Sequence, residues 1–138
     1  MLSRLLTPVL FAATALSVEA APLRSLSPDR GDLDDFRWQA RPVLIFAPSA
    51  DDPQYRAAMA ALQARSAALA ERRIVVLSDT APEAAGRLRT GFGVEGFRML
   101  LVGLDGGVKM DEARPIAIET LLDTIDRMPM RQGQRVEG

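Results

Sequence analysis

Two residue types are missing from this chain of 138 residues, which has no cysteine and no histidine. Without cysteine it can form no disulfide and no thiolate nucleophile, and it cannot hold an iron–sulfur cluster or a cysteine zinc site. Thiol–disulfide exchange and thiol peroxidase activity are excluded as well, because the attacking group in both is a thiolate. Without histidine the chain lacks the usual general base and the most common metal ligand. The sequence therefore predicts no catalytic residue, no metal site and no cofactor.

An excess of charge of one sign is also missing. The chain carries 17 Lys and Arg against 18 Asp and Glu, a formal net charge of -1. A protein that binds nucleic acid or an anionic lipid surface is expected to carry a strong positive charge. The composition therefore predicts no nucleic-acid partner. No apolar run after residue 20 is long enough to cross a bilayer, so we expect no membrane span in the processed protein.

Residues 1–20 have the features of a secretory signal peptide. Arg4 supplies the positive start, residues 5–18 form the apolar centre, and residues 18–20 provide a small-residue cleavage site. An N-terminal membrane anchor is the alternative, but Thr7 and Pro8 interrupt a segment already shorter than the ~18–20 residues that a spanning helix needs. We expect cleavage after Ala20 and a periplasmic or secreted mature protein.

The mature chain is long enough for one domain that folds without metal or disulfide. We expect a flexible N-terminus at residues 21–32, a folded domain at residues 33–131 and a polar tail at residues 132–138. Trp38 is the only tryptophan. Its apolar neighbours favour a role as an anchor that seals one end of the core, with a surface binding aromatic as the alternative.

A continuous apolar run at residues 43–47, between two prolines, predicts a strand that is buried on both faces. Ser49, Asp51 and Asp52 are helix-capping residue types, and Pro53 suits a first helical turn. We therefore expect a helix from Pro53 to about Ala70. Because the unpaired N–H groups of a helix N-terminus attract anions, Ser49 and Asp52 are candidate contacts to an anion or a partner.

Further strands are expected at residues 74–77, 99–102 and 108–110, with a hairpin turn at residues 105–106. A capping box at Thr80 and Glu83 predicts a short helix, and a last helix should run from Pro115 to Pro129 with residues 121, 122 and 125 facing the sheet. A helical crossover makes the first two strands parallel, and the hairpin makes the last two antiparallel. This order resembles the thioredoxin core: an α/β fold with a central mixed sheet of about four strands and helices on both faces.

Three local patterns have a plainer and a sharper interpretation. Residues 91–96 match the dinucleotide pattern G-x-G-x-x-G, but they follow a helix and lead into a strand, so we interpret them as a glycine-rich turn. Asp51 and Asp52 could bind a hard cation, but they lack the spacing of a calcium loop, and helix capping explains them better. Ser49 has neither the glycines of a nucleophile elbow nor a histidine partner, so a serine hydrolase is disfavoured.

Trp38 with residues 41–49, residues 105–109 and residues 125–131 resemble the DUDES-type domain of unknown function (domain of unknown function 4174). That domain occurs in short exported bacterial proteins and in animal extracellular-matrix proteins of the sushi-repeat and equarin type. The resemblance spans residues 33–131 and implies a thioredoxin-like fold in an extracytoplasmic setting. It supplies no agreed substrate and no catalytic residues to transfer.

The chain departs from redox thioredoxins at the two places where their chemistry lies. Laid over the thioredoxin pattern, Ala50 and Pro53 fall at the two cysteine positions, and Arg98 falls at the position of the cis-proline. The resemblance therefore extends to the fold and not to thiol chemistry.

Arg127, Arg131 and Arg135 recur every four residues around Met128 and Met130. They are either a basic helix end that complements the helix dipole, or a partner-docking edge. In a docking edge the methionines would be adaptable apolar contacts and Arg131 would pair with a carboxylate or phosphate. We expect the Arg131 guanidinium to lie in water, so that Arg131→Ala leaves the melting temperature nearly unchanged.

The sequence thus favours an exported, non-redox binding or accessory module whose partner is an unidentified extracytoplasmic protein. The alternative is an enzyme or small-anion binder that uses the loop at residues 49–52, with Arg98 or Arg41 as the electrophile.

Overall fold

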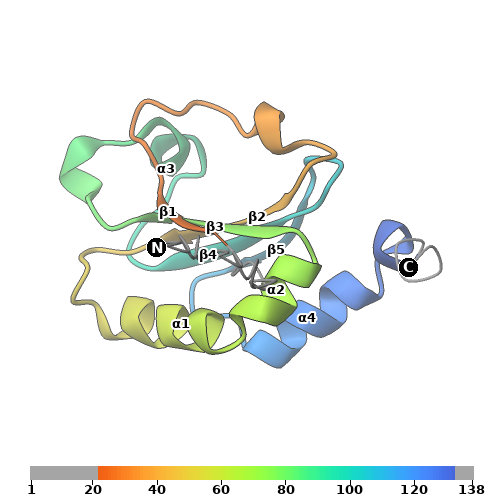
Figure 1. The fold of residues 1–138 in the computed structure, drawn as a ribbon. Helices are drawn as coiled ribbons and strands as arrows, with labels where there is room; N and C mark the ends of the chain where they lie inside the picture. Colours follow the sequence, from red (N-terminus) through yellow and green to blue (C-terminus); the bar gives the residue numbers. More distant parts are fainter. Residues whose placement is uncertain (1–21, 133–138) are drawn as a thin grey trace, which may run out of the picture.

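The computed structural model describes residues 22–132, which form a five-stranded mixed sheet with helices on both faces (Figure 1). Along the sheet the strand order is β1-β3-β2-β4-β5. Strands β1 and β2 run parallel to β3, whereas β4 runs antiparallel to both β2 and β5. The strands are β1 Leu23–Ser25, β2 Arg41–Phe46, β3 Ile74–Asp79, β4 Arg98–Val102 and β5 Val108–Glu112.

Helices α1, α2 and α4 lie on one face of the sheet, and α3 lies on the other (Figure 1). The α-helices are α1 Pro53–Ala64, α2 Ser66–Glu71, α3 Arg87–Gly91 and α4 Ile118–Asp126, and two short 3-10 helices span η1 Asp34–Phe36 and η2 Pro82–Ala84. The parallel and antiparallel pairs expected from the sequence are confirmed, as is the α/β architecture.

All six residues of β2 are buried, because packed layers cover both of its faces. Val43 and Ile45 belong to the core beneath α1, α2 and α4. Leu44 and Phe46 belong to a second core on the opposite face, which also includes Phe36. The uninterrupted apolar pattern of this strand is explained by burial on both sides.

The expected helix from Pro53 to about Ala70 is two helices. Asp52 caps the first, since its Oδ2 accepts the N–H of Tyr55 at 3.0 Å, and Pro53 occupies the first turn. The helical path breaks at Arg65, which has φ −119° and forms an ion pair with Glu119 of α4. Leu62 of α1 and Leu69 of α2 both remain in the core.

Two expectations about the N-terminal part of the domain are wrong. Residues 23–25 are not flexible: they form β1, which pairs with residues 76–78 of β3, and Leu26 is buried. Trp38 does not seal the core, because it is 56% exposed and has the left-handed φ of 64°. Phe36, two residues earlier, is the buried aromatic of this segment.

The short helices also differ from the capping-box prediction. Thr80 and Glu83 do not form the box: Asp79 Oδ1 accepts the N–H of Ala81 at 2.9 Å, and η2 has no side-chain cap. Helix α4 begins at Ile118 rather than at Pro115. Helix α4 ends at Asp126, shortly before Pro129, and Pro129 begins a further helical turn at residues 129–132. The glycine-rich turn is confirmed by the positive φ of Gly93 and Gly96.

Within residues 22–132, no helix is long and apolar enough to cross a membrane. The expected signal peptide at residues 1–20 and most of the expected polar tail lie outside the described residues.

Candidate functional site

The loop after β2, where thioredoxin-like proteins join a strand to a helix, presents an exposed Ser49 and a half-buried Asp52. The Asp52 carboxylate caps α1, so the capping interpretation of the Asp51–Asp52 pair is confirmed for Asp52. A carboxylate in that position makes the helix N-terminus a poor anion site, because it already provides the negative charge. No cluster of three or more Asp or Glu suited to a metal ion occurs among residues 22–132.

A buried ion pair, Arg89 with Asp79, lies behind this loop. Arg89 Nε and Nη2 each donate to the Asp79 carboxylate at 3.1 Å. Arg89 Nη2 also donates to the carbonyl oxygens of Ala47 and Asp79, at 3.0 and 2.9 Å, and the guanidinium lies 5.6 Å from the ring centroid of Phe46. One side chain thus fastens the carboxyl ends of β2 and β3 to each other. The sequence analysis missed this pair, because charged residues are seldom buried and nothing local marks these two.

Arg98, expected as an electrophile for the loop, is engaged elsewhere. It lies opposite Phe46 in the register of β2 and β4, close to the loop along the backbone. Its guanidinium, however, binds Asp111 of β5 at 2.5 and 2.7 Å and the carbonyl of Phe92 at 3.1 Å. The hydrogen bond from Arg98 lowers the pKa of Asp111, and the same bond raises the pKa of Arg98. No cis peptide bond occurs in the described chain, at Arg98 or elsewhere.

Arg41, the other expected electrophile, lies at the opposite end of β2 from the loop. Arg41 is the first residue of the strand and Phe46 the last. Five steps of ~3.3 Å separate them by roughly 16 Å, so Arg41 and Ser49 cannot act on one small ligand. The structure therefore does not bring the alternative site together as expected.

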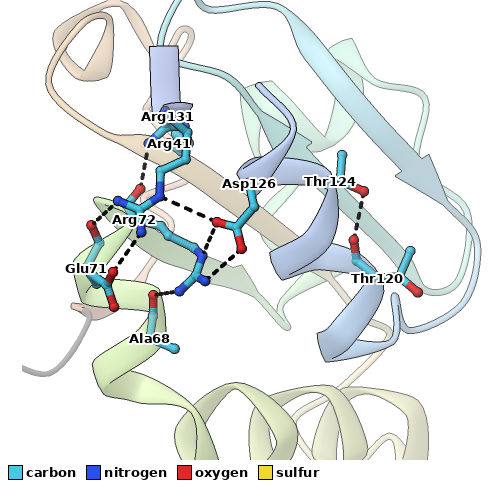
Figure 2. Close-up of polar contacts among 8 residues, drawn as sticks. All are labelled: Arg41, Ala68, Glu71, Arg72, Thr120, Thr124, Asp126 and Arg131. Carbon is cyan, nitrogen blue, oxygen red and sulfur yellow. Dashed lines mark hydrogen bonds and ion pairs between the residues drawn. The ribbon is translucent and has the colours of Figure 1, made fainter. Parts of the chain in front are cut away.

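The C-terminal signature is arranged differently from the prediction. Arg131 is only 6% exposed, so the expectation that its guanidinium lies in water is wrong. The turn at residues 129–132 folds back, and Arg131 Nη2 reaches Glu71 Oε1 at 2.7 Å (Figure 2). Met128 packs against the core, Met130 is half-buried, and Arg127 is exposed. Within the described part of the expected docking edge, Arg127 and Pro129 are the exposed residues, and Arg135 lies outside the described residues.

Arg131 belongs to a group that we call the arginine cluster, which brings together residues distant in sequence (Figure 2). Its members are Arg41 of β2, Glu71 of α2, Arg72, Asp126 of α4 and Arg131. Arg72 Nε and Nη2 bind the two oxygens of Asp126, both at 2.9 Å. Arg131 contributes a longer bond to Asp126 at 3.4 Å. These bonds lower the pKa of Asp126, Arg72 more strongly than Arg131.

Arg41 is the deepest member of the arginine cluster, with 0% exposure. Its Nη1 donates to the carbonyl of Arg72 at 2.8 Å. Its Nε and Nη2 are buried and have no hydrogen-bond partner among the described residues. Burial lowers the pKa of Arg41, and the charges of Arg131 and Arg73 lower it further. The sequence reasoning named Arg41 and Arg131 but gave no sign that they meet.

Surface hollows lie at two places near the candidate residues. One of about 490 Å³ lies at the amino-terminal ends of β2 and β3, and its lining includes Gln39, Ala40 and Arg73, next in sequence to members of the arginine cluster. Another of about 300 Å³ lies between β5 and α4, and its lining includes Met110, Pro115 and Thr120. Neither of these two hollows is lined by Ser49 or Asp52.

Comparison with solved structures confirms the thioredoxin-like fold. The reduced 2-Cys peroxiredoxin of Plasmodium vivax superposes with a TM-score of 0.56 over 75% of this chain and 84% of that chain. The two sequences are 15% identical, so the likeness concerns the fold alone. No curated protein matches the sequence. The family model for the domain of unknown function DUF4174 matches residues 32–134, and the chain therefore belongs to the DUF4174 family.

Proposed function

We propose that this protein is an exported, non-redox thioredoxin-like domain that serves as a binding or accessory module for an extracytoplasmic protein. The observation that carries the proposal is the state of the strand-to-helix loop. Arg89 fastens its inner side to Asp79, and Asp52 caps the helix that follows. Ala50 and Pro53 replace the two cysteines of redox members of the fold. The loop has no cysteine for thiol chemistry, and the chain has no histidine that could activate the Ser49 hydroxyl.

Export is supported by the signal-peptide features of residues 1–20. We expect the mature protein to begin at Ala21 and to be recovered outside the cytoplasm. Intact-mass measurement of natively expressed protein tests this directly. Retention of residues 1–20 in the recovered protein would contradict export by this route.

Trp38 is the residue that we propose as a partner contact. It is the most exposed large hydrophobic side chain among the described residues, at 56%. Its left-handed backbone, with φ 64°, costs roughly 1–2 kcal/mol for a residue other than glycine. A hydrogen bond from its N–H to the carbonyl of Leu104, at 2.7 Å, holds it there. Tryptophan is one of the residue types enriched among those that dominate binding energy at protein interfaces.

The test is chemical crosslinking in the native extracytoplasmic compartment, followed by capture of this protein. Wild type is compared with Trp38→Ala and with Arg127→Ala, an exposed control in the C-terminal segment. We expect one crosslinked protein to be lost with Trp38→Ala and retained with Arg127→Ala. A crosslinking pattern that is identical for all three proteins would remove Trp38 as the contact.

Non-redox character is tested with the purified wild-type protein in disulfide reductase and thiol peroxidase assays. We expect no activity above background, because the chain has no thiol. An activity that survives repurification and disappears on substitution within residues 49–53 would overturn the proposal.

A further inference from the structure

We propose that Arg41 is the ligand-binding residue of a small-oxoanion site at the amino-terminal end of β2, covered by the turn at residues 129–132. The site is separate from the strand-to-helix loop and from Trp38. It therefore stands or falls independently of the export and partner proposals.

The first argument is the balance of charge in the arginine cluster. Three guanidinium groups share two carboxylates. Arg72 donates to both oxygens of Asp126, and Arg131 donates to Glu71. Arg41 is left with a single bond to a neutral carbonyl. A buried charge is stable only where a counter-charge or a full set of hydrogen bonds compensates its lost hydration. The cluster thus has one negative charge too few, and the arginine without a counter-charge is Arg41, its most deeply buried member.

The second argument is which atoms of Arg41 lack a partner. A guanidinium binds two oxygens side by side through Nε and Nη2. In this protein Arg72 binds Asp126 through those two atoms at 2.9 and 2.9 Å, and Arg98 binds Asp111 through them at 2.5 and 2.7 Å. In Arg41 the same two atoms have no partner among residues 22–132. The matching ligand therefore carries two oxygens on one centre, as phosphate, sulfate and carboxylate do.

The third argument is the positive charge that surrounds Arg41. Arg131 is a near neighbour, because it and Arg41 donate to the consecutive carbonyls of Glu71 and Arg72. The charges of Arg131 and of Arg73 each lower the pKa of Arg41, after the larger effect of burial. Asp126 acts in the opposite direction, but Arg72 already holds both of its oxygens. An anion bound on Arg41 would meet positive charge on more than one side.

The fourth argument concerns access. Figure 2 shows Arg131 beside Arg41, reaching it from the turn that follows α4. Two of the bonds that hold Arg131 are long, at 3.4 Å, and the short one ends on Glu71, whose side chain is 66% exposed. All three bonds end on residues of α2 and α4, so displacing Arg131 would break no hydrogen bond between strands of the sheet. Because Arg41 is enclosed when the turn is in place, the site suits a small free anion better than the end of a peptide.

The experiment uses the folded protein with inorganic phosphate as the probe and acetate as a second one. Each is titrated by calorimetry and by thermal denaturation against sodium chloride at matched ionic strength, which removes general screening. We expect saturable binding with one anion per chain. Arg41→Met should weaken it at least tenfold, whereas Arg127→Met, which removes an exposed arginine, should change it less than twofold.

A second readout needs no variant and keeps the proposal testable if Arg41→Met does not fold. The Nε–H resonances of the arginines are followed by nuclear magnetic resonance during the phosphate titration. We expect saturating downfield movement of a single buried arginine signal, with the Arg72 signal, already bonded to Asp126, nearly unmoved. The proposal would be overturned if neither phosphate nor acetate gave a saturable response beyond that to chloride. An equal response in Arg41→Met would also overturn it.

Discussion

A buried arginine lies near each end of β2, and the two have very different surroundings. At the carboxyl end, two nitrogens of Arg89 donate to the carboxylate of Asp79, and one of them also donates to two carbonyl oxygens. At the amino end, Arg41 makes one hydrogen bond and leaves Nε and Nη2 without a partner among the described residues. Arg89, which has a counter-charge, ties two strands together, whereas Arg41, which has none bonded to it, is where a bound anion would add most stability.

The largest expected effect is at the carboxyl end of β2, where Arg89 is bonded to its counter-charge. Asp79→Ala leaves the Arg89 guanidinium buried without its counter-charge, and we expect a loss of about 3–5 kcal/mol in the free energy of unfolding. Urea denaturation followed by circular dichroism measures it. The matched control is Asp111→Ala, which breaks the more exposed pair with Arg98 and should cost about 0–1 kcal/mol. Equal losses in the two variants would show that the Asp79–Arg89 pair is not a structural tie.

The next effect concerns Arg131, in the turn at residues 129–132 that lies over the arginine cluster. Arg131→Ala removes a buried guanidinium that bonds to Glu71 and Asp126, and we expect a loss of about 1–3 kcal/mol. This reverses the expectation drawn from the sequence that the substitution would be silent. Arg127→Ala, on the exposed side, should change stability by less than about 0.5 kcal/mol. Thermal denaturation of the two variants side by side tells them apart, and a silent Arg131→Ala would mean that the turn contributes little to stability.

A smaller effect, of opposite sign, is expected at Arg41. In a chloride buffer Arg41→Met replaces an under-bonded buried charge with an apolar side chain of similar length, and we expect a gain of about 1 kcal/mol. Arg89→Met should instead destabilise, because Asp79 would lose its partner. The two melting temperatures should therefore move in opposite directions from wild type. A loss of stability in both variants would remove the contrast between the two ends of β2.

The smallest expected effect is a dependence on pH at the arginine cluster. Arg72, and secondarily Arg131, lower the pKa of Asp126 in the folded protein relative to the unfolded chain. The stabilisation is therefore complete above the unfolded value of about 3.9 and is lost as pH falls through the lower folded value. For this partly exposed carboxylate we expect less than about 1 kcal/mol. Melting temperatures between pH 6 and pH 3 should fall less steeply in Asp126→Asn than in wild type.

The sequence predicted four of the five strands because each carries a local apolar pattern or follows a glycine turn. It did not predict β1, since Leu23, Arg24 and Ser25 are exposed and become a strand only by pairing with β3. The arginine cluster was unpredictable for a related reason. Arg131 and Glu71 are 60 residues apart, and only the fold brings them together. Charged residues follow no periodic pattern that reveals burial, so Asp79, Arg89 and Arg131 all read as surface positions.

The position of Trp38 determines what optical measurements on this protein can report. As the single tryptophan, it dominates the intrinsic fluorescence, yet it lies outside both hydrophobic cores. Its backbone is tied to Leu104, at the turn that leads from β4 to β5. The emission therefore reports on the contact between this loop and that turn, and on anything that covers the ring. Unfolding curves followed by fluorescence and by circular dichroism need not coincide, and a blue shift on mixing with another protein would identify the binding face directly.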